Sequence, residues 1–285
     1  MKNPLFRRLG QSSAIALLLC FASAASGSGP AGQLPKVWFS MGGWGQIPSP
    51  GHHSWEVLYL QPNGTWPAFM DHVTVVGILT QVLVKMPDAD LAKVAARLKE
   101  KHVALGIEML AQADDAPAGC GGGVEGYYAP FMVANIAAKL KRTGAEPSYI
   151  AMDEPLWFGH YYNGKNACHS SIASVAERVA KNLREYLKVF PNVTIGDGEP
   201  FPAITDQPNW KDDYKHWIEA FHAKVGKELA FTDVDINWGG QELACIRRGL
   251  SVLCQGREDA DGHYLQCAAA VRVYDQPGLA RRRRP

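Results

Sequence analysis

The sequence predicts an α/β fold of the TIM (β/α)8-barrel type, with about six recognisable β/α units. Three observations support this prediction. Short apolar strands alternate with amphipathic helices from Pro35 onward, a pattern typical of a parallel sheet covered by helices. The units recur at roughly 30 to 45 residues, and about 250 residues remain after the N-terminal segment, which matches one barrel domain.

The predicted strands are short apolar segments that end in polar or loop residues. They cover Lys36 to Met41, His72 to Leu83, Val103 to Leu110, Ser148 to Asp153, Val193 to Asp197 and Leu229 to Asn237. Long loops rich in Gly, Pro and aromatic residues follow several of them. The two strands that would complete an eight-stranded barrel are missing from this pattern.

Apolar residues between the strands recur at helical spacing, as Leu91, Val94 and Leu98 do in the first helix. The predicted helices cover Asp90 to Lys101, Phe131 to Lys141, Ser174 to Val189, Asp212 to Lys224 and, at its beginning, Gln241 to Arg248. Each helix joins two consecutive strands, which favours a parallel sheet.

The N-terminus has the order of an export signal. Basic residues precede an apolar stretch from Ala14 to Phe21, and small residues follow it at Ala22 to Ala24. We expect residues 1–24 to be a cleaved signal peptide, residues 25–35 a linker, and the mature protein to be secreted or periplasmic. Leu19 is too large for the position before a lipidated Cys20, so we expect no stable membrane anchor.

The C-terminal part departs from the pattern. We expect the barrel domain to span residues 36–250 and residues 251–285 to form an irregular basic tail, in which Cys267 to Tyr274 is compatible with one short strand. Two explanations are open: a truncated or frame-shifted barrel, which we favour, and an open sheet that ends in a basic tail. The oligomeric state is not predicted.

Charge and cysteine usage exclude several classes of function. Lys and Arg number 29 against 28 Asp and Glu, so no overall field would attract nucleic acid. No Cys/His cluster has zinc spacing and no glycine-rich phosphate loop opens a helix, so we expect neither a metal nor another cofactor. In an oxidising compartment Cys120 and Cys168 are the favoured disulfide pair, because both lie in loops that follow neighbouring strands.

Carboxylates gather at the C-terminal ends of the predicted strands, where barrel proteins place their reacting groups. They are Glu108, Asp153, Glu154, Asp197, Glu199, Asp233 and Asp235. Bringing like charges together raises their pKa values, a cost that functional sites tolerate. Side-chain alternation puts Asp233, Asp235 and Asn237 on one face, which we expect to line the barrel interior.

Aromatic residues are concentrated in the same strand-end loops. Trp44, Trp157 and Tyr161 are among them, whereas aromatics that serve only the core favour the interiors of helices and strands. Aromatic rings stack on the apolar faces of sugars, and carboxylates and amides bind sugar hydroxyls. The loops therefore predict a carbohydrate-binding cleft.

The segment Ile150-Ala151-Met152-Asp153-Glu154-Pro155 resembles the end of strand four in the large clan of barrel glycoside hydrolases, which reads Asn-Glu-Pro. The resemblance implies that Glu154 is a general acid. It also places Asp153 where that clan has an Asn that binds the sugar's 2-hydroxyl. The clan's nucleophile lies on strand seven, which this chain lacks, so the second carboxylate would be Asp235 or Glu199.

The main hypothesis is thus a secreted glycoside-hydrolase-like barrel that hydrolyses or binds a polysaccharide or oligosaccharide. The residues expected to bind substrate are Asp153, Glu108, Trp157, Tyr161, Trp44 and Asn237. One alternative is a non-catalytic or degenerate carbohydrate-binding barrel. Another is a hydrolase whose carboxylates hold a divalent cation, with His160 as a helper.

Overall fold

The structure is a computed structural model that describes residues 37–41, 68–115, 119–236 and 269–271. The predicted signal peptide, the loop that carries Trp44, the sixth-strand residue Asn237 and the segment Gln241 to Arg248 lie outside these residues. Among the described residues no helix is long and apolar enough to cross a membrane.

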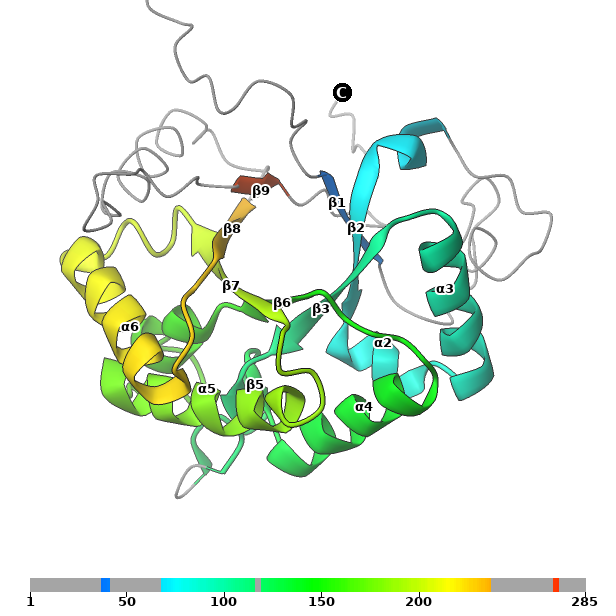
Figure 1. Cartoon of the computed structure of the whole chain (residues 1–285). Coiled ribbons are helices and arrows are strands. Elements are labelled where there is room, and N and C mark those ends of the chain that lie inside the picture. The colour runs from blue at the N-terminus through cyan, green and yellow to red at the C-terminus, as the bar shows by residue number, and fades with distance from the viewer. Residues whose placement is uncertain (1–36, 42–67, 116–118, 237–268, 272–285) are drawn as a thin grey trace, which may run out of the picture. The chain divides into compact units, whose positions relative to one another are not determined.

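A seven-stranded parallel sheet forms the centre of the fold, in the order β1-β2-β3-β6-β7-β8-β9 (Figure 1). The strands are β1 (Val37–Met41), β2 (Val73–Leu79), β3 (Ala104–Leu110), β6 (Tyr149–Asp153), β7 (Thr194–Phe201), β8 (Phe231–Ile236) and β9 (Ala269–Val271). The terminal strands β1 and β9 approach each other. The predicted fold class, a TIM-type α/β barrel, is therefore confirmed, and the described residues are consistent with an incomplete one.

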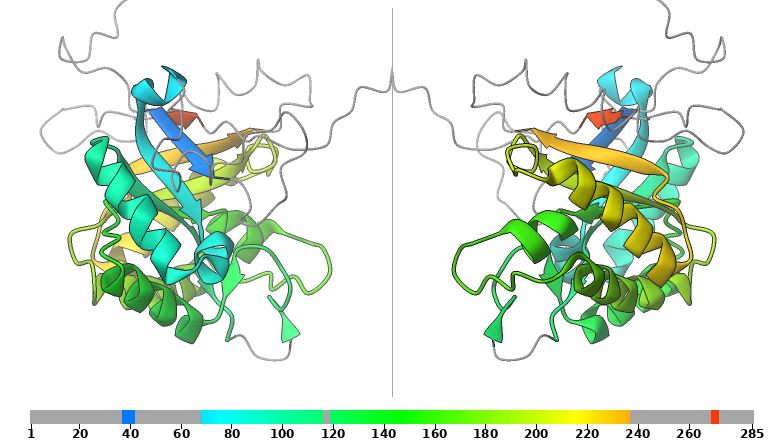
Figure 2. Two further views of the ribbon diagram at one scale, coloured as in Figure 1. Left: turned by 90° about the vertical axis from the view of Figure 1, so that its right-hand side faces the viewer. Right: turned by 90° about the vertical axis from the view of Figure 1, so that its left-hand side faces the viewer.

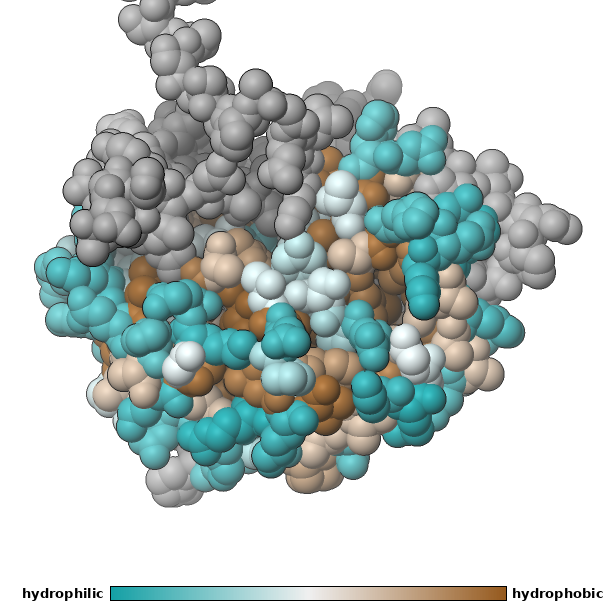
Figure 3. Space-filling model, in the orientation of Figure 1, coloured by the Kyte–Doolittle hydropathy of each residue, from teal (hydrophilic) through white to brown (hydrophobic). Residues whose placement is uncertain are grey.

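Helices cover the outer face of this sheet (Figures 1 and 2). They are α2 (Thr80–Lys85), α3 (Asp88–Glu100), α4 (Pro130–Arg142), α5 (Ile172–Leu187) and α6 (Trp210–Val225), with the short helices η1 (Ala68–His72) and η3 (Trp157–Tyr161). The strands β4 (Gln112–Ala113) and β5 (Tyr127–Tyr128) form a separate small parallel pair. Polar residues predominate over the helical perimeter seen in Figure 3.

Two of the predicted strands have different ends in the structure. The second stops at Leu79 and not at Leu83, because Thr80 begins α2 and its hydroxyl donates a hydrogen bond to the Glu108 carbonyl at 2.8 Å. The fifth continues beyond Asp197 to Phe201, since Gly198, Glu199 and Pro200 remain paired with β8. Gly198, Glu199 and Pro200, residue types common in turns and loops, therefore continue the strand here because β8 pairs with them.

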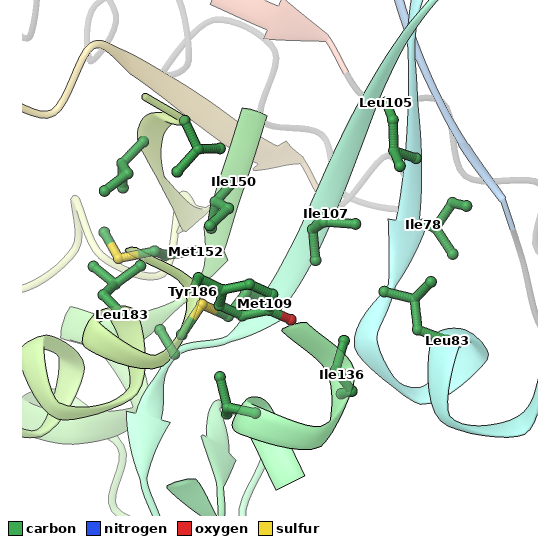
Figure 4. Close-up of a cluster of buried hydrophobic side chains, with 14 of the residues drawn as sticks. Ile78, Leu83, Leu105, Ile107, Met109, Ile136, Ile150, Met152, Leu183 and Tyr186 are labelled. Atoms are coloured by element: carbon green, nitrogen blue, oxygen red, sulfur yellow. The ribbon is translucent and has the colours of Figure 1, made fainter. Parts of the chain in front are cut away.

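The main hydrophobic core lies between the sheet and the helices (Figure 4). Ile107 and Ile150 from neighbouring strands face Ile136 of α4 and Leu183 of α5, and all four are buried. Burial of this apolar surface is the dominant favourable contribution to folding, at roughly 25 cal/mol per Å². The helices are consequently fixed against one face of the sheet only.

A second, smaller core fills the interior of the curved sheet. Trp38, Val75, Ala151 and Phe231 are buried together, and the Trp38 ring lies 5.1 Å from the rings of both Tyr149 and Phe231. Small residues make room for these rings, because a Cβ on Gly196 would lie within 2.2 Å of Phe231. This cluster identifies which face of each strand points inward.

Candidate active site

Three strands send carboxylates to the inner face beyond the aromatic cluster. Side chains two apart share a face of a strand. Glu108 shares the inner face with Ala104, Asp153 with Ala151, and the pair Asp233 and Asp235 with Phe231. The prediction that Asp233 and Asp235 line the interior is thus confirmed, while Asn237 lies outside the described residues.

Glu108 and Asp233 are the deepest of these inner carboxylates, with 6% and 1% of their surfaces exposed. The Ser40 hydroxyl of β1 donates a hydrogen bond to Glu108 Oε2 at 3.3 Å. Ser40 was not among the predicted site residues, and nothing in its sequence context distinguishes it from another strand serine. It brings β1 into the site.

Glu154 follows β6 directly and has a left-handed backbone, with a φ of 46°. A residue that precedes proline is normally restricted to an extended conformation, and Glu154 departs from this restriction. The Glu154 N–H donates to the Gly198 carbonyl at 2.9 Å, and the Glu154 carbonyl accepts the Phe158 N–H at 3.0 Å. The residue therefore turns the chain from strand to helix at the rim of the sheet.

The Glu154 and Asp235 side chains interact electrostatically. Burial raises the pKa of Glu154 from 4.5 to about 9, and the negative charges of Asp153, Asp235 and Glu125 add to this rise. The pKa of Asp235 is also raised, first by burial and then by the charge of Glu108. Glu154 is thus protonated at neutral pH.

Glu199, the other candidate for the second carboxylate, lies in a different environment. It is fully buried, and its Oε1 and Oε2 accept the N–H groups of Leu156 at 2.7 Å and Trp157 at 3.0 Å. Burial and the charge of Asp197 raise its pKa, while the two N–H groups lower it. Both of its oxygens are therefore committed to the backbone that follows Glu154.

Asp197 does not face the interior. Its Oδ2 accepts hydrogen bonds from the Tyr214 hydroxyl at 3.0 Å and the Trp217 indole N–H at 2.9 Å, both on α6. Asp197 and Glu199, two residues apart, share a face of β7, and that face packs against the helices. Of the seven strand-end carboxylates, these two belong to the helix layer.

The aromatic segment after Glu154 is a π-helix, η3, where the sequence predicted a loop. The rings of Trp157 and Tyr161 lie 6.3 Å apart, and both are partly exposed. The Tyr161 hydroxyl donates to Asp213 Oδ2 at 2.6 Å, and His160 Nδ1 bonds the Ser170 carbonyl at 2.7 Å. The polar ends of Tyr161 and His160 are thus engaged, which leaves ring faces as the available surface.

The predicted disulfide between Cys120 and Cys168 is present. It joins the loop after β3 to the loop after η3, and the Gly121 N–H reinforces the junction by donating to the Asn166 carbonyl at 2.8 Å. The first of these loops also carries Glu125, whose charge acts on Glu154. Sequence reasoning missed Glu125, because it lies in an exposed turn and not at a strand end.

A second missed residue is Gln112 of β4, which is completely buried. Its Nε2 donates to the Pro155 carbonyl at 3.1 Å. A buried amide shortly after a strand end is a weak signal in sequence, since polar residues there are mostly exposed. In the described part of the chain, no group of three or more His, Cys, Asp or Glu residues is arranged to hold a metal ion.

The comparisons with known proteins give distant structural matches only. No protein-family model and no curated protein matches the sequence. Among solved structures, a psychrophilic glycoside hydrolase family 10 endo-β-1,4-xylanase is 9% identical, with a TM-score of 0.47, and the match covers 79% of this chain and 71% of the xylanase. The Ignisphaera aggregans GH53 catalytic domain is 10% identical, with a TM-score of 0.38 and coverage of 60% and 52%.

Another match is the orotidine 5′-monophosphate decarboxylase of Methanocaldococcus jannaschii, at 9% identity, a TM-score of 0.40 and coverage of 84% and 88%. The chain spans about half the length of the GH53 domain. The neighbours thus include glycoside hydrolases of barrel fold and an enzyme of unrelated chemistry. The fold and site together define an α/β barrel with a group of carboxylates at the C-terminal ends of its strands, among which Glu154 has a pKa raised to about 9.

Proposed function

We propose that this chain is a secreted carbohydrate-active barrel in which Glu154 acts as a general acid and Asp235 as its partner carboxylate. The observation that carries the proposal is the place of Glu154 in the turn directly after β6, beside the inner carboxylates, together with its pKa of about 9. A carboxyl group with that pKa is protonated at neutral pH, as an acid that protonates a leaving oxygen must be.

The chemistry follows from the positions of the two groups. Glu154 donates its proton to the glycosidic oxygen, which leaves as an alcohol while the C1–O bond breaks. Asp235 stabilises the developing positive charge at C1, water adds to C1, and the proton that this water loses returns to the Glu154 carboxylate. The partly exposed aromatic residues Trp157 and Tyr161, shortly after Glu154, support a sugar as the substrate.

Asp235 is the better candidate for the partner role than Glu199. Asp235 interacts electrostatically with Glu154, whereas both Glu199 oxygens accept backbone N–H groups. The separation of the two carboxyl groups in the substrate complex would distinguish a retaining enzyme, at about 5 Å, from an inverting one, at about 6.5 to 9.5 Å. A glycosidic oxygen must come within hydrogen-bond reach of Glu154 to receive its proton.

The high pKa of Glu154 also favours a second candidate function, binding without hydrolysis. If Glu154 holds its proton too tightly to release it, the inner carboxylates and the rings of η3 bind a carbohydrate but no proton reaches the glycosidic bond. Export, in either case, is supported by the disulfide and by the N-terminal sequence.

The test is hydrolysis of a broad panel of polysaccharides and aryl glycosides by the parent, Glu154→Gln and Asp235→Asn. Glu177→Gln serves as the matched control, because Glu177 is an exposed carboxylate on α5. We expect release of sugar by the parent and the control. The rate of hydrolysis should fall about 10²-fold or more in Glu154→Gln. Calorimetric binding without release would assign the binding function, and equal release by all variants would remove Glu154 from the mechanism.

A further inference from the structure

The turn that carries Glu154 combines an unfavourable backbone conformation with a functional side chain. A φ of 46° is uncommon for a non-glycine residue and persists only where the surroundings impose it. The next residue, Pro155, has no N–H group of its own. Other residues must therefore hold this turn in place.

Three hydrogen bonds to the residues after Glu154 come from two buried side chains. Glu199 accepts the N–H groups of Leu156 at 2.7 Å and Trp157 at 3.0 Å. Gln112 donates to the Pro155 carbonyl at 3.1 Å. Because Glu199 is on β7 and Gln112 is on β4, the turn is held from two separate elements.

The packing around Gln112 shows that the site is built around this side chain. A Cβ at Gly159 of η3 would lie 2.8 Å from both polar atoms of the Gln112 amide and 2.6 Å from Val175. Only a glycine allows the π-helix to lie this close to the amide. Neither Gln112 nor Glu199 has any measurable exposed surface, so neither can touch a substrate in this arrangement.

We propose that Glu199 and Gln112 are positioning residues for the proton-donating group: they fix the Glu154–Trp157 turn so that the Glu154 carboxyl interacts with Asp235. The proposal rests on the proposed function for its catalytic meaning. Its structural content, the placement of the Glu154 carboxyl, is measurable in the free protein whether or not a glycoside is hydrolysed.

The readout is the titration of Glu154 in the full-length protein labelled with ¹³C at the glutamate carboxyl carbon. The signal is assigned by its absence in Glu154→Gln. If the turn relaxes, the carboxyl loses its burial and its interaction with Asp235, and its pKa falls from about 9 toward its ordinary value. We expect a fall of at least one unit in both Glu199→Gln and Gln112→Met.

The two variants separate position from charge. Glu199→Gln also removes a carboxylate whose charge interacts with Glu154, so a fall in that variant alone has two explanations. Gln112→Met changes no charge, so a fall there reports position. Asp197→Asn is the matched control, because it alters the neighbouring buried carboxylate on the same face of β7, which bonds α6 and not the turn.

Where the panel has identified a substrate, both variants should lower kcat at least tenfold with a smaller change in KM, since neither residue touches the sugar. An unchanged Glu154 pKa in folded Gln112→Met would overturn the proposal, as would an equal fall in Asp197→Asn. If Glu199→Gln does not fold, Gln112→Met decides the question alone. A shifted pKa without any hydrolysis would support the positioning role and contradict the catalytic function.

Discussion

Strands β7 and β8 are neighbours that carry nearly the same pattern, Asp197-Gly-Glu199 and Asp233-Val-Asp235, yet they send their carboxylates to opposite faces of the sheet. Asp197 and Glu199 face the helices and have backbone, tyrosine and tryptophan partners. Asp233 and Asp235 share the inner face with Phe231. Asp197 and Glu199 thus stabilise the surrounding structure, whereas Asp233 and Asp235 belong to the candidate site.

The cause of this difference lies in the residues that alternate with the carboxylates along each strand. On β7 the inward positions include Gly196, which must be small because the Phe231 ring of β8 occupies the space beside it. On β8 the intervening Val234 is buried in the main core with the helices. On β8 the apolar Val234 therefore faces the helices. On β7 Gly196 occupies the inner face, and Asp197 and Glu199 face the helices.

The largest effect that tests this comparison is expected from Asp197→Ala. The change leaves the Tyr214 hydroxyl and the Trp217 N–H buried without this acceptor, at a cost of about 1 to 3 kcal/mol for a buried donor. We expect a loss of about 3 kcal/mol in the free energy of unfolding, measured in urea. Asp235→Ala relieves repulsion among like charges and should cost less than about 1 kcal/mol. Equal losses of unfolding free energy in Asp197→Ala and Asp235→Ala would contradict the structural role assigned to the carboxylates that face the helices.

Filling the inner face of β7 should have a smaller effect. In Gly196→Ala the new methyl group would overlap the Phe231 ring, and overpacking of this kind costs about 1 to 3 kcal/mol. We expect about 2 kcal/mol by the same urea measurement. The Phe231→Leu background offers a smaller side chain, so the penalty of Gly196→Ala should shrink there. An unchanged cost of Gly196→Ala in this background would show that the new methyl group does not overlap the side chain at position 231.

The smallest effect, taken per pH unit, concerns the pH dependence of stability. Glu154 titrates near 4.5 when unfolded and at about 9 when folded, so the folded state keeps a proton that the unfolded state releases between these values. The stability that this group supplies is fully present below pH 4.5 and is lost as the pH rises through 9. The slope is at most about 1.4 kcal/mol per pH unit. Urea unfolding between pH 6 and 8 should therefore be flatter in Glu154→Gln than in the parent, and parallel slopes would contradict the raised pKa.

The parts of the fold that depend on periodicity were predictable from the sequence. The apolar alternation and the helical spacing give the strands, the four helices α3 to α6 and the parallel order, and the loop positions give the Cys120–Cys168 pair, whereas α2 was predicted as part of a strand. Glu154 and Asp235 could be selected as rim carboxylates for the same reason. Periodicity also grouped Asp197 with Glu199.

The remaining features depend on partners far away in the sequence. Which face Asp197 and Glu199 occupy is decided by Phe231 and by α6, more than fifteen residues further along the chain. Gln112 matters only because the turn at Pro155 packs onto it. The left-handed backbone of Glu154 contradicts the usual restriction before proline, because tertiary hydrogen bonds outweigh the local preference.

The Cys120–Cys168 disulfide has a consequence for how the protein is produced. The loop that it fastens carries Glu125, and the charge of Glu125 contributes to the high proton affinity of Glu154. Protein made in a reducing cytosol lacks this bond, and its Glu125 loop is free to move away from the rim. Such material would fold around the same core, but its Glu154 would bind a proton less tightly. An inactive preparation from the cytosol would therefore reflect the reduced state of Cys120 and Cys168 and not the chemistry of the carboxyl groups.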